Sequence, residues 1–138
     1  MKLYTDETGH QEVRAIGALV VAQIARVEVP AALWGKQRSG AMTATLAQEL
    51  TTEFEDDWSG HNETPPRFAV VALSPQLLDE AARLCAVHGL RAYDGVHLSA
   101  AVAARRADSG CSTMTAFDRM LRVAAAGEGF TLVPTLDD

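Results

Sequence analysis

The chain has 138 residues and is 48% apolar, which suits one folded domain and excludes a disordered chain. Its formal net charge of -6 argues against a broad phosphate-binding surface and favours a basic partner or a site that collects cations. No apolar run is long enough for a membrane span or a signal peptide, and Cys85 and Cys111 lack metal-ligand spacing. We therefore expect a single cytoplasmic domain over residues 1–138.

Helical and strand-like patterns alternate along the chain. The predicted helices cover residues 11–18, 26–38, 41–56, 75–88, 93–107 and 118–126. The predicted strands fall within residues 18–25, 67–73, 111–117 and 130–134. This alternation predicts an α/β sandwich with a mainly parallel sheet, although such a sheet normally begins with a strand and this chain begins with a helical pattern.

Two helix starts are marked by proline. Pro30 is tolerated in a first turn, where backbone N–H groups have no partner, so it predicts that a helix begins close to Glu28. Ser74 and Pro75 form an N-cap and first helical position, and Gly89 suits the end of the same helix. These local signals predict where both helices begin.

Three acidic residues differ in setting from the others, most of which suit solvated helix faces. Glu28 lies between two valines, Asp94 among apolar and small residues, and Asp118 directly after a strand-like run. Each is expected within about one turn of a helix N-terminus, and such positions gather at the carboxyl edge of an open parallel sheet. Carboxylates that meet there repel one another unless a cation such as Mg²⁺ or Mn²⁺ neutralises them.

A purely structural role explains the same acids. Asp and Glu are common near helix N-termini because they cap the helix and because its dipole favours negative charge. From the residues alone, the prediction is a candidate acidic metal site on an α/β domain, and a generic acidic α/β binding module stays open as an alternative.

Longer stretches of the sequence resemble the PIN-domain family, and specifically VapC-type toxins. RVEVPAAL (26–33), LRAYDGVHLSAA (90–101) and AFDRMLRVAAAGEGF (116–130) resemble the three later motifs of that family, and KLYTDETG (2–9) resembles the segment after its first strand. The resemblance implies a three-layer sandwich and a single-stranded RNA endonuclease that uses Mg²⁺, or Mn²⁺, to hydrolyse phosphodiesters. It also implies a cognate antitoxin, an RNA substrate and a homodimer as partners.

Residue by residue, the resemblance assigns the second, third and fourth acids of the family to Glu28, Asp94 and Asp118. Asp94 is then the main metal ligand, while the other two ligate the ion or orient its water. The family often has Thr or Ser two residues before the last acid; here that residue is Ala116, and Thr115 stands one position earlier.

The family's first acid lies on an opening strand that comes before the stretch matching residues 2–9. The sequence has no counterpart of that strand or its acid, so we expect an N-terminally truncated PIN-like domain. One interpretation is a start codon assigned too late, with an active longer protein. The alternative is a catalytically impaired PIN remnant that only binds an antitoxin or another protein.

Several side chains are candidates for RNA contact or support. Arg91 and Arg119 stand close in sequence to Asp94 and Asp118, and they could form a locally basic rim. His97 lies one helical turn after Asp94, so it suits either contact with RNA or water, or simple packing.

Three further residues have predicted roles outside this set. Leu33 and Trp34 suit either the core or an apolar groove for an antitoxin helix. His88, at a helix end, is expected to be structural.

Overall fold

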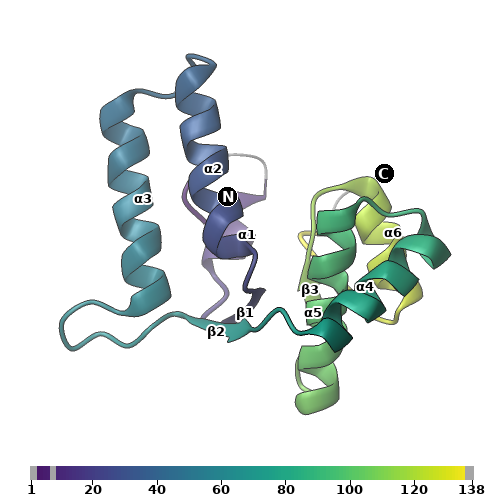
Figure 1. Cartoon of the computed structure of the whole chain (residues 1–138). Coiled ribbons are helices and arrows are strands. Elements are labelled where there is room, and N and C mark those ends of the chain that lie inside the picture. Colours follow the sequence, from purple (N-terminus) through teal and green to yellow (C-terminus); the bar gives the residue numbers. More distant parts are fainter. Residues whose placement is uncertain (1–2, 7–8, 136–138) are drawn as a thin grey trace.

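The computed structural model describes residues 3–6 and 9–135, which form an α/β fold (Figure 1). The helices are α1 (His10–Arg14), α2 (Ala25–Arg38), α3 (Ala44–Ser59), α4 (Pro75–His88), α5 (Ala92–Ala107) and α6 (Arg119–Gly127). The strands are β1 (Leu19–Ala22), β2 (Phe68–Val71), β3 (Thr113–Thr115) and β4 (Thr131–Val133). Every predicted helix and strand is present, so the α/β class is confirmed. None of the helices in this part of the chain is long and apolar enough to cross a bilayer.

The predicted helix signals had different outcomes. Ser74 caps α4 by accepting a hydrogen bond from the Leu77 backbone N–H at 3.2 Å, and Gly89 ends the helix in the left-handed region, as predicted. The predicted start of the helix at residue 26 is confirmed to within one residue, because α2 begins at Ala25, but Pro30 lies beyond the first turn in which it was expected. The consequence is local: proline lacks the N–H that would bond the carbonyl four residues earlier.

The strands form two separate two-stranded sheets instead of one continuous sheet. β1 pairs in parallel with β2, from Leu19 opposite Phe68, and β3 pairs in parallel with β4, from Thr113 opposite Thr131. The prediction of parallel pairing is confirmed. The described strands form two sheets where one was predicted. No strand among residues 3–6 and 9–135 joins the two pairs.

Helices cover both pairs of strands. Helix α2 packs on α3, and α4 packs on α5, which also contacts β1 and β2 (Figure 1). Small residues allow this close packing: buried Ser99 of α5 donates a hydrogen bond to the Leu77 carbonyl of α4 at 2.8 Å. Helix α5 therefore lies at the centre of the fold and links its two halves.

Two main hydrophobic clusters stabilise the halves. The first lies between α4, α5, α6 and the β3–β4 pair, and includes Leu84, Leu98 and Phe130. The second is aromatic, with Tyr4 meeting Phe54 edge to face at a centroid distance of 5.9 Å. A smaller cluster of Ala22, Leu77 and Ala100 joins β1 to α4 and α5.

Tyr4 provides a stability test of the aromatic cluster. Its hydroxyl donates a hydrogen bond to Asp57 Oδ2 at 2.7 Å, and burial, with the nearby Asp57 charge, raises the pKa of Tyr4 above its ordinary range. Tyr4→Phe keeps the ring and loses this bond, so we expect a loss of about 1–2 kcal/mol in unfolding free energy. Urea denaturation measures it, with exposed Tyr93→Phe as the matched control. Equal stability of the Tyr4→Phe chain and the unmodified chain would contradict the expectation.

Candidate functional site

The three predicted acids lie where local sequence placed them, in the first turns of helices or at their caps. Glu28 is in the first turn of α2, Asp94 is in the first turn of α5, and Asp118 is the N-cap of α6. Glu28 and Asp94 are half-buried, whereas Asp118 is exposed. The helix dipoles favour negative charge at all three positions.

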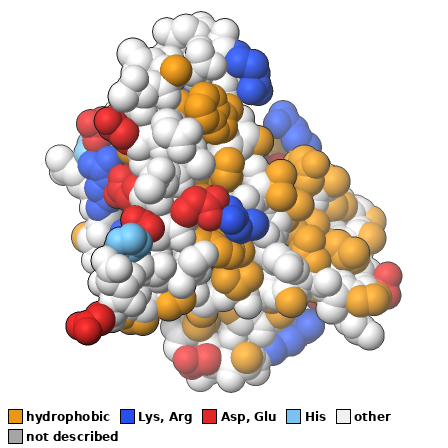
Figure 2. Space-filling view, turned by 60° about the vertical axis from the view of Figure 1, so that its left-hand side comes forward, with side chains coloured by type: hydrophobic (Ala, Val, Ile, Leu, Met, Phe, Trp, Pro, Cys, Tyr) orange, Lys and Arg blue, Asp and Glu red, His pale blue; other side chains and the backbone are white. Residues whose placement is uncertain are grey.

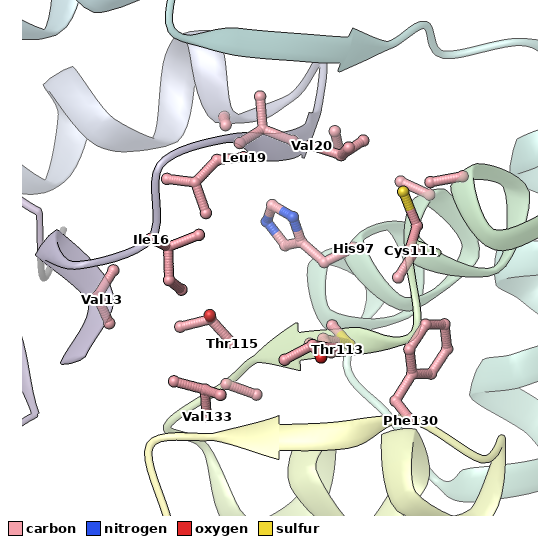
Figure 3. Close-up of a pocket in the computed structure, with 18 of the residues that line it drawn as sticks. Val13, Ile16, Leu19, Val20, His97, Cys111, Thr113, Thr115, Phe130 and Val133 are labelled. Carbon is pink, nitrogen blue, oxygen red and sulfur yellow. The ribbon is translucent and has the colours of Figure 1, made fainter. Parts of the chain in front are cut away.

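A cavity of about 930 Å³ brings two of these acids together. Asp94 and Asp118 both line it, together with His97 and Thr115. Figure 3 shows His97 from α5 between the side chains of β1 and those of β3. Residues more than twenty positions apart in the chain thus share one concave space, which is the usual form of a ligand site.

Glu28 joins this group through His97. Nε2 of His97 lies 2.5 Å from Oε2 of Glu28, and both side chains are about one-third exposed or less. This pair connects α2 to α5 across 69 residues of sequence. The sequence offered two interpretations of His97, and the structure shows a hydrogen-bonded histidine that holds a predicted site acid.

The charges of the other two acids act on Asp94. Desolvation raises the pKa of the Asp94 carboxyl most strongly, and the charges of Asp118 and Glu28 raise it further. The charges of Arg91 and His97 act in the opposite direction. Burial and like charge together destabilise an ionised carboxylate, and perturbed acids of this kind gather at functional sites.

Asp118 has a structural role that can be separated from its charge. Its Oδ1 accepts hydrogen bonds from the backbone N–H groups of Met120 at 2.9 Å and Leu121 at 3.1 Å. Asp118→Ala removes this cap and should cost about 1 kcal/mol of unfolding free energy, whereas Asp118→Asn keeps a capping oxygen and should cost little. Thermal unfolding of both variants tests the cap, and equal losses would contradict it.

The same two variants separate capping from charge in any activity assay. If the negative charge of Asp118 matters at the cavity, Asp118→Asn loses activity even though its stability is retained.

The donors suit a hard divalent cation in type, since carboxylate oxygens are the ligands that Mg²⁺ and Mn²⁺ prefer. The positions of these donors do not by themselves make a full set of metal ligands. Within the described ranges, no three His, Cys, Asp or Glu side chains stand close enough together to hold one metal ion. Asp94 and Asp118 face the cavity, while a carboxylate oxygen of Glu28 is held by His97.

The two predicted arginines are exposed and lie close in sequence to the acids of the cavity. Arg91 occupies the N-cap position of α5 without a side-chain capping bond, and Arg119 is the first residue of α6, directly after Asp118. Arg122, on the same helix as Arg119, donates a hydrogen bond to the Ala116 carbonyl at 2.8 Å. On the face in Figure 2, Lys and Arg side chains are scattered among acidic and apolar ones instead of gathered in one band.

Burial and contacts decide two predictions outside the acid cluster. Of the two interpretations of Leu33, the structure supports a core residue, because its side chain is fully buried. His88 is structural, as predicted, because its Nε2 pairs with Oε1 of Glu128 at 2.7 Å.

The sequence analysis did not predict the contact between Glu28 and His97. The Glu28–His97 pair is long-range, and its only sequence signal is that His97 follows Asp94 by one helical turn.

Comparison with known proteins gives two relatives of near-full length. The chain is 30% identical over 138 residues to "Ribonuclease VapC45" and to "Ribonuclease VapC49", from two strains of Mycobacterium tuberculosis. Each match covers 97% of this chain and 89% of the relative. A scan against protein-family profiles finds no match.

Proposed function

The chain belongs to the VapC-type family of PIN domains, and we propose that it is the ribonuclease toxin of a toxin–antitoxin pair. The observation that carries the proposal is the meeting of Asp94 and Asp118 in one cavity, with Glu28 held beside them by His97. Both relatives are named ribonucleases, which suggests the activity. The acids that meet in the cavity are a candidate site for that activity.

We further propose that the activity depends on Mg²⁺, for which Mn²⁺ could substitute. Asp94 and Asp118 would hold the ion, since their carboxylates share the cavity and the Asp118 charge helps to raise the pKa of Asp94. When bound, the ion would lower the pKa of a water and stabilise charge on the scissile phosphate. No residue set in the described chain completes a ligand shell, so other oxygen donors are also required.

The neighbouring side chains have supporting roles in this proposal. His97 fixes the orientation of the Glu28 carboxylate toward the site, and Thr115 offers a hydroxyl from the cavity wall. Exposed Arg91 and Arg119 contact the phosphates of single-stranded RNA at the rim. Because these cations are few, substrate binding should weaken only modestly as salt concentration rises.

The partners follow from the same family membership. We propose a cognate antitoxin and a homodimer, and the net charge of -6 favours an antitoxin segment rich in Lys or Arg. The three-layer PIN arrangement, with a strand joining the two sheets, belongs to this proposal too.

A catalytically impaired PIN remnant is the second candidate. The observation that favours it is that the described acids do not form a three-ligand metal site. Such a protein would still bind an antitoxin, but it would not cleave RNA.

An RNA cleavage assay distinguishes the two candidates. We expect the purified chain to cut a single-stranded oligonucleotide with Mg²⁺, to cut the matching duplex much more slowly, and to stop when EDTA removes the ion. Cleavage that persists in EDTA would contradict metal dependence. A chain that binds the antitoxin yet cuts no RNA with either Mg²⁺ or Mn²⁺ would support the impaired form.

A further inference from the structure

Tyr93 is an exposed aromatic side chain that stands directly before Asp94. It is 61% exposed, whereas every other aromatic side chain in the described chain is buried or half-buried. From the described residues, its hydroxyl receives no hydrogen bond and its ring has no aromatic contact. A single exposed apolar side chain needs no explanation by itself, but this one adjoins a candidate catalytic acid.

Helix geometry places the Tyr93 ring beside the candidate site. Tyr93 is the second residue of α5, and His97 follows it by four positions, so the two side chains lie on the same face of the helix. His97 and Asp94 line the cavity, whereas Tyr93 does not. Because side chains of a helix tilt toward its N-terminus, the ring projects over the start of α5, next to the cavity and not inside it.

The charges around Asp94 give a phosphate chain little affinity. The described lining of the cavity includes Asp94 and Asp118 but no Lys or Arg. Desolvation and the Asp118 charge raise the pKa of Asp94, and the charge of exposed Arg91 opposes them, so Arg91 is a cation near this acid. With so few cations, an RNA needs a second source of affinity. Base stacking on an aromatic ring is such a source, because every base has an apolar face.

We propose that Tyr93 is the platform on which one base of the single-stranded RNA stacks, namely the base of a nucleotide next to the phosphate at Asp94. This inference rests on the ribonuclease proposed above. Arg91, two residues earlier, contacts the backbone of the same nucleotide. The bases of a single strand can turn outward onto a ring, whereas those of a duplex are covered by their neighbours. Tyr93 therefore selects unpaired RNA and adds little sequence specificity.

The test measures whether Tyr93 and one RNA base act as a pair. Initial rates of Mg²⁺-dependent cleavage give KM and kcat on a single-stranded oligonucleotide and on copies with one abasic nucleotide at each position beside the cut. Tyr93→Ala removes the ring, and Tyr93→Phe keeps it. The matched control is Leu78→Ala on α4, which shortens a side chain that is 47% exposed and does not line the cavity. Thermal unfolding checks that all variants are folded.

We expect Tyr93→Ala to raise KM by about tenfold with kcat nearly unchanged, because stacking binds the substrate without taking part in the reaction. Tyr93→Phe and Leu78→Ala should keep the KM of the unmodified chain. At one position beside the cut, the abasic nucleotide should raise KM for the unmodified chain by a similar factor. It should have little further effect on Tyr93→Ala, since both changes remove the same contact.

Three results would overturn the proposal. The first is an unchanged KM in Tyr93→Ala, and the second is a loss confined to kcat. The third is a set of abasic effects that multiply with Tyr93→Ala at every position, so that no base is paired with the ring. If KM is unchanged and sedimentation shows weaker self-association of Tyr93→Ala, the ring belongs to an interface between two copies of the chain.

Binding without cleavage separates this inference from the ribonuclease proposal. Fluorescence anisotropy of a labelled single strand gives the Kd for the Asp94→Asn chain with and without Tyr93→Ala, and the second change should raise Kd by about tenfold. If the unmodified chain cuts RNA and Tyr93→Ala alters neither KM nor Kd, only the stacking platform fails. If the unmodified chain cuts no RNA and Kd still rises tenfold, only the ribonuclease proposal fails. A chain that neither cuts nor binds RNA would overturn both.

Discussion

Asp94→Asn should reduce RNA cleavage by at least about a hundredfold and leave the fold intact. The substitution removes the charge of the acid that lies in the cavity with Asp118, and its shape is nearly unchanged. Loss of one group that stabilises charge in an active site costs on the order of 10²–10³ in rate, and loss of an ion ligand is expected to cost no less. Initial cleavage rates under saturating Mg²⁺ measure the effect.

The stability of the same variant distinguishes a functional acid from a structural one. Desolvation and the charges of Asp118 and Glu28 raise the pKa of Asp94, so ionising it costs the native state free energy. That cost is absent below the unfolded-state pKa of about 3.9 and present in full above the raised native pKa. Asp94→Asn should therefore be at least as stable as the unmodified chain at neutral pH in a chelator, with the difference vanishing in acid.

The control for Asp94→Asn is Asp79→Asn on α4, an exposed acid away from the cavity. We expect it to change neither cleavage nor stability. If Asp94→Asn lost substantial stability and kept its activity, Asp94 would be a structural residue and the proposed site would be wrong.

Gly95→Ala should destabilise the chain, although alanine usually favours a helix over glycine. A Cβ at position 95 would overlap Sγ of Cys85 and stand 3.1 Å from the Ala81 carbonyl oxygen of α4. Overpacking of this kind costs about 1–3 kcal/mol, which exceeds the gain in helix propensity of at most about 1 kcal/mol. We expect Tm to fall by several degrees in thermal unfolding.

A matched glycine and a double variant separate crowding from helix propensity. Gly35 lies inside α2, where a Cβ would meet only an Arg38 guanidinium nitrogen at 3.9 Å, so Gly35→Ala should stabilise the chain. Cys85→Ala removes the clashing sulfur, so Gly95→Ala should cost less in that background. If Gly95→Ala stabilised the chain, the crowding against α4 would be relieved by a small shift of the helices. If the losses of stability from Gly95→Ala and Cys85→Ala simply added, Cys85 would not be the cause of the crowding.

The role of Gly95 also explains part of a sequence motif. Gly95 follows Asp94 directly and lies against α4. The glycine allows the two helices to approach closely, and the first turn of α5 then brings Asp94 to the cavity. Helix packing and site geometry therefore depend on neighbouring positions in the chain.

Features with local causes were predictable from the sequence. Ser74, Pro75 and Gly89 define α4 because capping involves residues only a few positions apart. Asp118 was expected at a helix N-terminus for the same reason, and it caps α6. The start of α2 was predicted to within one residue, although Pro30 lies beyond the first turn and the helix continues through it.

By itself, the sequence determined the α/β class, the helices and strands, the three acids at helix N-termini, and the motifs that point to the VapC-type family. Only the tertiary structure decided that Glu28 is held by His97, that Asp94 and Asp118 share a cavity, and that the described strands divide into two parallel pairs. The reason is physical: caps and helical periodicity act within one or two turns, whereas strand pairing and charge coupling join residues tens of positions apart, and their geometry depends on how the whole chain packs.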